Sequence, residues 1–290
     1  MKPASSVITA LVAAASFAHG HYVFDKLIIE GEMTEPWQYI RENTREKKYM
    51  PTKFFNSFGT TPLDDDFRCN QGAFSSANNT STASVAPGVF LGMKLAYGAT
   101  MKHPGPAQVY VSESDGPVSE YDGSGDWFKI HQETVCGSSG EYLEDMDWCT
   151  WDKDQLTFQI PINIPPGEYL IRVEHIGLHG GHVGEAEFYY SCAQIRVSGN
   201  GTGQPHPPLV KIPGVYNNEE SGIRFNIYGA ADYPYHPGPA LWTGDENATS
   251  TPRPSGPSTS SSFISTVTRS SSTCSHKRRR GLRLTRLLEI

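Results

Sequence analysis

The sequence predicts an all-β protein, an antiparallel β-sandwich with long loops, and three observations support this fold class. Short runs of alternating apolar and polar residues recur along the first 244 residues. Clusters of Gly, Pro, Asn and Asp separate these runs and are typical of turns and loops. No long stretch has the 3.6-residue period of an amphipathic helix. Many short strands between turns are the pattern of a sandwich.

Seven segments carry the strand pattern. They are residues 21–29, 89–98, 107–113, 155–161, 168–176, 186–199 and 222–228. The segment 36–48 is the one place where we expect a helical turn. The connections between the strands are long, and long loops are where binding and catalytic residues concentrate.

The first 20 residues have the pattern of a secretory signal peptide. Lys2 precedes an apolar run that is too short to span a bilayer, and Ala18 and Gly20 supply small residues before a cleavage point. Cleavage after Ala15 or Ala18 is the alternative. We expect cleavage after Gly20 and a secreted, extracellular protein without a membrane span.

Composition divides the rest of the chain at residue 244. Residues 21–244 resemble one globular domain, whereas residues 245–290 form a Ser/Thr/Pro-rich linker and a basic tail, which we expect to be disordered. The chain has 24 basic and 31 acidic residues, a net charge of −7. Without Lys2 and the tail from residue 276, 17 basic residues face 30 acidic ones. Such an acidic domain should repel nucleic acid and anionic membranes.

Four of the five cysteines lie in this domain and can form two disulfides, in three pairings, in an oxidising compartment. Cys136 and Cys149 flank one short loop and are the natural pair, which leaves Cys69 with Cys192. No CxxC spacing is present, so a zinc site is disfavoured. The N-glycosylation sequons that we expect to be used begin at Asn79 and Asn247.

A histidine at the start of the mature chain predicts a metal site. His21 would carry a free α-amino group beside its imidazole, and the two can chelate one ion. One further imidazole completes an all-nitrogen site, and nitrogen ligands in a tetragonal arrangement suit Cu(II). The candidates for it are His103, His131, His175, His179, His182, His206 and His236. His103 ends a predicted strand before a Pro-Gly-Pro turn, where a ligand can be held rigidly; an ordinary surface histidine is the alternative.

The predicted strand at 186–199 supplies further members of the site. Alternation puts Glu187 and Tyr189 on one face and Cys192 on the other. The phenol of Tyr189 could then lie over the copper as a long axial ligand, with Glu187 beside it. A tyrosine packed in the sandwich core is the alternative.

Taken together, these residues resemble fungal lytic polysaccharide monooxygenases of auxiliary activity family 9. The resemblance covers nearly all of residues 21–244. It rests on HYVFDKLII, DFRCN, HPGPAQVYVS, IPPGEYLIRVEHIGLH, EFYYSCAQIRVSG, GIRFNIY and PGPALWTG. It implies an immunoglobulin-like sandwich with one copper ion, bound by the amino and ring nitrogens of His21, the ring of His103 and, axially, Tyr189. It also implies that His179 hydrogen-bonds oxygen species near the metal, and it matches the bridge between Cys69 and Cys192.

The chain departs from the family at one position of this site. Glu187 stands where the family usually has glutamine, two residues before the axial tyrosine. A carboxylate adds negative charge near the metal and donates no hydrogen bond unless it is protonated. Burial would raise its pKa, whereas the charge of the metal would lower it. We therefore predict an active enzyme whose oxygen activation is altered and depends on pH.

The activity implied by the resemblance is oxidative cleavage of β-1,4-glycosidic bonds in cellulose or a related β-glucan. It proceeds at C1 or C4, or at both, with O2 or H2O2 and an external electron donor, and we expect a monomer. Aromatic rings stack on the flat faces of sugars. The candidate rings, each of which could instead pack beneath its loop, are those of Trp37, Tyr39, Tyr233 and Tyr235.

Other functions fit the sequence less well. A purely structural sandwich is disfavoured, because it would not need His21 at its N-terminus. The alternative function is a non-catalytic copper- or glycan-binding protein of the extracellular cell wall, which the carboxylate of Glu187 would allow. Hydrolysis by paired carboxylates is disfavoured, because the acidic pairs cluster in segments typical of solvated loops.

Overall fold

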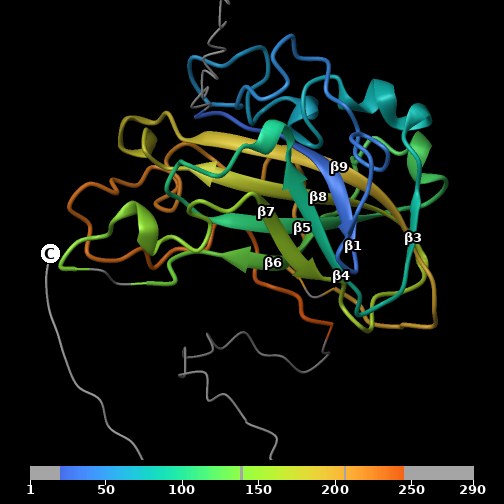
Figure 1. Ribbon diagram of the computed structural model, residues 1–290. Helices are drawn as coiled ribbons and strands as arrows, with labels where there is room; N and C mark the ends of the chain where they lie inside the picture. The colour runs from blue at the N-terminus through green and yellow to red at the C-terminus, as the bar shows by residue number, and fades with distance from the viewer. Residues whose placement is uncertain (1–19, 138–139, 206, 245–290) are drawn as a thin grey trace, which may run out of the picture. The chain divides into compact units, whose positions relative to one another are not determined.

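The computed structural model describes residues 20–137, 140–205 and 207–244, which form a β-sandwich with long covering loops (Figure 1). Residues 1–19 of the predicted signal peptide, His206 and the predicted tail 245–290 with Asn247 lie outside the described residues. No helix in the described ranges is long and apolar enough to cross a membrane. The division at residue 244 stays a prediction.

Two sheets face each other in the sandwich (Figure 1). The four-stranded sheet is antiparallel, in the order β2 (Glu32–Met33), β1 (Phe24–Ile29), β4 (Phe90–Leu95), β7 (Gln155–Gln159). The five-stranded sheet has the order β3 (Ala83–Val85), β9 (Glu187–Val197), β8 (Gly167–Gly177), β5 (Ala107–Ser114), β6 (Phe128–Glu133). Its strands are antiparallel except β3, which pairs with β9 in parallel.

Short 3-10 helices lie in the connections between these strands. They are η1 (Asp65–Phe67), η2 (Ala73–Asn79), η3 (Ala96–Gly98), η4 (Val118–Glu120), η5 (Asp145–Asp147) and η6 (Gly181–Val183). The predicted helical turn in 36–48 is absent, since this part of the described chain contains turns, bends and one bridge at Ile40.

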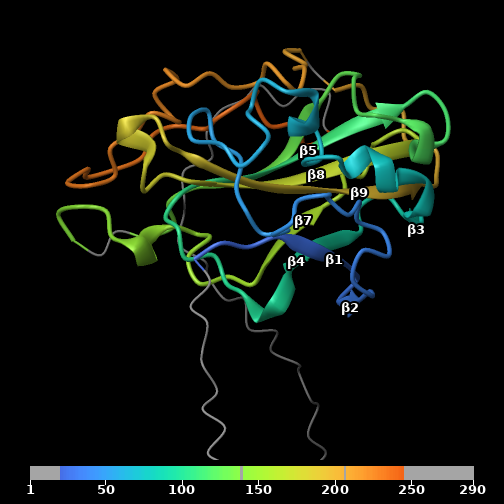
Figure 2. The ribbon, with the colours of Figure 1, turned by 90° about the horizontal axis from the view of Figure 1, so that it is seen from above.

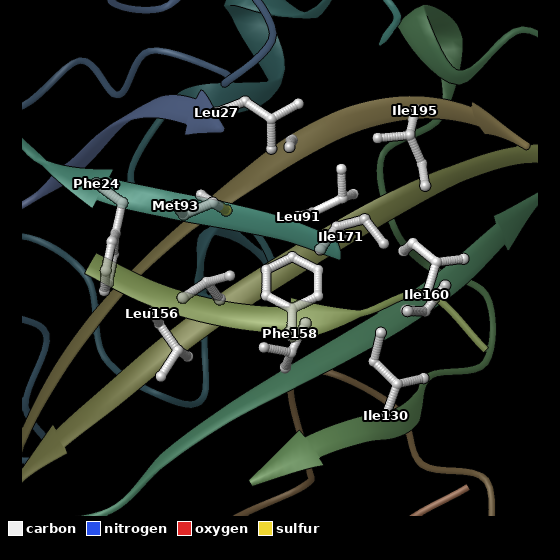
Figure 3. Close-up of a cluster of buried hydrophobic side chains, with 14 of the residues drawn as sticks. Phe24, Leu27, Leu91, Met93, Ile130, Leu156, Phe158, Ile160, Ile171 and Ile195 are labelled. Carbon is white, nitrogen blue, oxygen red and sulfur yellow. The ribbon is translucent and has the colours of Figure 1, made fainter. Parts of the chain in front are cut away.

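The main core lies between the two sheets. Leu91 and Met93 of β4 alternate with residues that point away from the core and pack toward Ile171 and Ile195 of the opposite sheet (Figure 3). The edge strand β7 shows the same pattern, with Leu156 buried and its neighbours more exposed. The apolar residues that recur at every second position of these strands in the sequence are therefore the ones that face the core.

A second apolar cluster covers the outer face of the five-stranded sheet. Figure 2 shows loops of the first third of the chain and the segment 207–244 on the side of β8 and β9 that faces away from β1 and β4. Phe188 and Tyr190 of β9 point into this cluster. Both faces of β8 and β9 are consequently buried, and nearly all of their residues are inaccessible to solvent.

Both predicted disulfides are present. Cys69 is bonded to Cys192 and ties the loop after η1 to the outer face of β9. Cys136 is bonded to Cys149, which lies 13 positions later in the sequence, and the bond closes a short loop. The pairing expected from spacing is confirmed.

Six of the seven predicted strand segments contain strands, and the seventh is wrong. Residues 222–228 form turns and irregular chain instead, because Ile223 and Ile227 pack in the cluster on the outer face of the sheet and have no strand partner among the described residues. The sequence reading missed β6, an edge strand with the polar sequence FKIHQE.

Candidate metal centre

Four chain segments meet at the end of the sandwich where β8 finishes and β9 begins. His21 lies three residues before β1, and His103 lies in the loop between η3 and β5. His179 follows β8, and Glu187 is the first residue of β9, opposite Gly177 in the register of the two strands. Residues that are 166 positions apart in sequence, His21 and Glu187, are thereby brought together.

The loop that carries His103 is fixed to β8 by its backbone. The N–H of Ile176 donates to Pro106 O (2.9 Å) and the N–H of Leu178 donates to Pro104 O (2.8 Å). A Cβ at Gly105 would lie 1.8 Å from Ile176 O, so the approach of the two backbones requires glycine here. The Pro-Gly-Pro turn therefore holds His103 rigidly, as its sequence position predicts.

The carboxylate of Glu187 lies at the centre of the cluster. Its Oε2 atom is 3.8 Å from His21 Nε2, 3.7 Å from His103 Nε2 and 3.7 Å from His179 Nε2. The hydroxyl of Tyr189 donates a hydrogen bond of 2.5 Å to the same oxygen. The side chain of Glu187 is only 8% exposed, so one buried negative charge is surrounded by three imidazoles and a phenol.

Burial and neighbouring groups shift the pKa values of the two central residues. Burial lowers the pKa of His103 to about 4, and the nearby His179 acts in the same direction. Burial opposes ionisation of Glu187, but the proximity of His21, Tyr189 and the other two imidazoles outweighs it and lowers its pKa to about 2. At neutral pH, His103 is therefore a neutral ligand with a free lone pair, and Glu187 is a carboxylate. Any titration of Glu187 is moved below the ordinary acidic range.

Tyr189 is held beneath the histidines by aromatic contacts. Its ring is 2% exposed, stacks on Tyr22 with a centroid distance of 4.1 Å and lies 5.8 Å from the ring of His103. Tyr22 is in turn hydrogen-bonded to His175 Nδ1 at 2.7 Å. Glu187 and Tyr189 share the face of β9 opposite to Cys192, as the alternation predicts, and Tyr189 also belongs to the main core, as the alternative expects.

These residues fit a metal ion. Single ligand atoms of His21, His103 and Glu187 all lie within 4.8 Å of one another. Among the described residues, no geometrically sound hydrogen bond to His103 Nε2 is found although this atom is buried, which is costly for a polar atom unless something else binds it. His179 is stacked on His103 with a centroid distance of 4.3 Å, so it borders the group without belonging to it.

The four aromatic candidates for glycan binding are placed differently. Trp37 and Tyr39 are half-buried and pack against the main core, and Tyr235 is half-buried against the outer cluster. Tyr233 is 3% exposed, and its hydroxyl donates to Gly222 O. The expectation for Tyr233 is therefore corrected, because a buried ring cannot stack on a polysaccharide.

The sequence reading missed Tyr228. This residue is 61% exposed, its hydroxyl donates to His179 O (3.2 Å), and its ring contacts that of His182 at 5.5 Å. An exposed aromatic ring thus lies directly beside the histidine cluster. The sequence signal was the terminal tyrosine of GIRFNIY, which the strand interpretation of 222–228 obscured.

In this β-sandwich, three histidines from different segments surround one carboxylate at one end of the strands. The fold and this cluster indicate a candidate metalloprotein. The sequence model of "Auxiliary Activity family 9 (formerly GH61)" matches residues 21–235. The chain belongs to this family of lytic polysaccharide monooxygenases. The enzymes of the family are copper-dependent oxidoreductases. The expected family and enzyme class are confirmed, and so is the sandwich fold.

Relatives and solved structures support the assignment. The chain is 53% identical over 235 residues to the AA9 family lytic polysaccharide monooxygenase G of Aspergillus tamarii, covering 81% of this chain and 69% of that protein. It is 52% identical to monooxygenase A of Aspergillus fumigatus, with 82% and 81% covered. The crystal structure of a cellulose-active polysaccharide monooxygenase from M. thermophila aligns with a TM-score of 0.63 and 27% identity, covering 77% of this chain and 99% of that one.

Proposed function

We propose that the mature protein begins at His21 and oxidatively cleaves cellulose or a related β-1,4-glucan with one bound copper ion. The observation that carries this proposal is the convergence of the ring nitrogens of His21 and His103 beside the carboxylate of Glu187, within 4.8 Å of one another. The family match begins at residue 21, which supports cleavage after Gly20. Members of the family are secreted fungal enzymes, in keeping with the predicted signal peptide.

The proposed copper ligands are the amino group and ring of His21, the ring of His103 and the phenol of Tyr189. When bound, copper would supply the redox chemistry, with electrons from an external donor and O2 or H2O2 as the oxidant. The chain's own part is to hold the ligands: the Pro-Gly-Pro turn fixes His103, and the stack with Tyr22 fixes Tyr189. The proposed role of His179, which stacks on His103, is to hydrogen-bond oxygen species near the metal.

The glucan is proposed to lie across the end of the sandwich that carries the histidines. Tyr228 offers an exposed ring beside His179, and aromatic rings stack on sugar faces. The less exposed Trp37, Tyr39 and Tyr235 remain candidates for further contacts. The M. thermophila structure is described as cellulose-active, which supports cellulose as the first substrate to test.

The experiment is to incubate the mature protein with copper, ascorbate and amorphous cellulose and to analyse the soluble products. Aldonic or 4-keto oligosaccharides are expected, and their type reports attack at C1 or C4. The non-catalytic alternative, a copper- or glycan-binding cell-wall protein, predicts adsorption to cellulose without oxidised sugars.

A further inference from the structure

We propose that the carboxylate of Glu187 is itself a ligand of the metal and biases the bound ion toward the divalent state. This inference rests on the proposed metal site. It goes beyond that site because it adds an anionic oxygen to nitrogen and phenol ligands. The site would then contain two histidines, the phenol of Tyr189 and one carboxylate around the same ion.

The position of the carboxylate carries the proposal. Glu187 Oε2 is nearly equidistant from His21 Nε2 and His103 Nε2, at 3.8 and 3.7 Å. Two side-chain ligands of one ion lie several ångströms apart, because each contacts the ion rather than its neighbour. The third side chain in the group of His, Cys, Asp and Glu ligand atoms within 4.8 Å is Glu187, whereas His179 is outside it.

The surroundings leave the carboxylate without a full counter-charge. No Lys or Arg is paired with Glu187 among the described ion pairs; its partners there are the three histidines. A buried charge is normally paired or bound to a metal. The 2.5 Å hydrogen bond from Tyr189 occupies one lone pair of Oε2 and orients the carboxylate toward the histidines.

The predicted consequence concerns the charge of the ion. Attraction between a carboxylate and a cation grows in proportion to the cation's charge, so it favours Cu(II) over Cu(I). A hard oxygen ligand also suits Cu(II) and Zn(II) better than the softer Cu(I). A neutral amide at this position would provide neither effect. Glu187 should therefore raise affinity for divalent ions with little effect on monovalent copper.

The test measures metal binding and needs no turnover. The mature wild-type chain and its E187Q variant are titrated with Zn(II), Cu(II) and Cu(I), the last in competition with a chromogenic chelator. We expect E187Q to bind Zn(II) about tenfold more weakly and Cu(I) almost unchanged. The ratio of Cu(II) to Cu(I) affinity should fall about tenfold, which raises the one-electron potential by about 59 mV.

Two further variants sharpen the result. E185Q makes the same change two residues upstream, where the carboxylate pairs with Lys53 and Asn56 outside the cluster, and it should leave all affinities within twofold. E187D keeps the charge but shortens the reach by one methylene, so direct ligation predicts weaker Zn(II) binding than in the wild type. Near-UV circular dichroism checks that each variant is folded.

The outcomes separate the two proposals. Zn(II) affinity of E187Q within twofold of the wild type, or an E187D chain with full affinity, would overturn ligation by Glu187. An equal loss of Cu(I) and Zn(II) affinity in E187Q would overturn the bias toward the divalent state. Failure of the wild-type chain to bind copper would instead contradict the proposed function.

Discussion

The phenol oxygen of Tyr22 lies 2.7 Å from His175 Nδ1, and this buried pair borders the candidate metal centre, because the ring of Tyr22 also contacts that of His103. Tyr22 is 2% exposed and His175 is fully buried. The ring of Tyr22 also stacks on Tyr189. The first residue after the predicted N-terminus is thus anchored both to β8 and to Tyr189, which would be one of the residues that hold the metal.

Removal of this hydrogen bond should destabilise the protein. In Y22F the buried His175 Nδ1 loses its partner, and an unpaired buried polar atom costs about 1–3 kcal/mol. Urea denaturation of the metal-free protein measures the loss. Y97F is the control, because Tyr97 is 72% exposed, and it should change stability by less than about 0.5 kcal/mol. Equal stability of Y22F and the wild type would contradict the role given to this pair.

The metal-free protein should lose stability as the pH falls below about 6.5. Burial lowers the pKa of His175 to about 3 and that of His103 to about 4, whereas both take up protons near pH 6.5 when unfolded. Between these limits the unfolded chain binds more protons, so each histidine reduces stability by about 1.4 kcal/mol per pH unit.

Denaturation midpoints at pH 7, 6 and 5 measure this slope. H175F removes one of the two histidines. The dependence of stability on pH should therefore become shallower by up to about 1.4 kcal/mol per pH unit, although the variant is also less stable at pH 7. A wild-type slope that H175F leaves unchanged would show that His175 is not held neutral by burial.

The Pro-Gly-Pro turn should not tolerate a side chain at its centre. In G105A the new methyl group would meet Ile176 O at 1.8 Å, and the loop carrying His103 would have to move. We expect a loss of at least about 2 kcal/mol in stability and weaker metal binding. G116A is the matched control, because no atom lies within 4 Å of a Cβ at that position. Normal copper affinity in a folded G105A would contradict rigid positioning by the turn.

The ring of Tyr228 should contribute to glucan binding. Loss of one stacking ring in Y228A is expected to weaken adsorption to cellulose about two- to tenfold, in line with about 0.5–1.5 kcal/mol for an aromatic contact. F90A removes an exposed ring at the opposite end of β4 from the metal centre and serves as the control. If both variants adsorb as the wild type does, the ring beside His179 does not bind the polysaccharide.

The sequence predicted those features that local patterns encode. Alternation located the core strands and put Glu187 and Tyr189 on one face, because the inner face of a sandwich must be apolar. The position of His103 before a Pro-Gly-Pro turn indicated a rigid ligand. The N-terminal histidine and the family resemblance together predicted the cluster at the end of β8 and β9.

Other features depend on tertiary contacts that a local pattern does not contain. The strand pattern at 222–228 was misleading, because its apolar residues pack in the cluster on the outer face of the five-stranded sheet without pairing as a strand. For the same reason the sequence did not predict that Tyr233 is buried and Tyr228 is exposed. The strand β6 was missed because an edge strand need not be apolar.

The central claim is that the amino group of His21 itself binds the metal. Two chains are compared with copper, ascorbate and amorphous cellulose: one begins at His21, and the other retains Gly20 in front of it. We predict oxidised oligosaccharides from the first chain and at least about a hundredfold less from the second, because its amine is one residue too far away to share a small chelate ring with the imidazole. Equal yields of oxidised products from the two chains would contradict the claim.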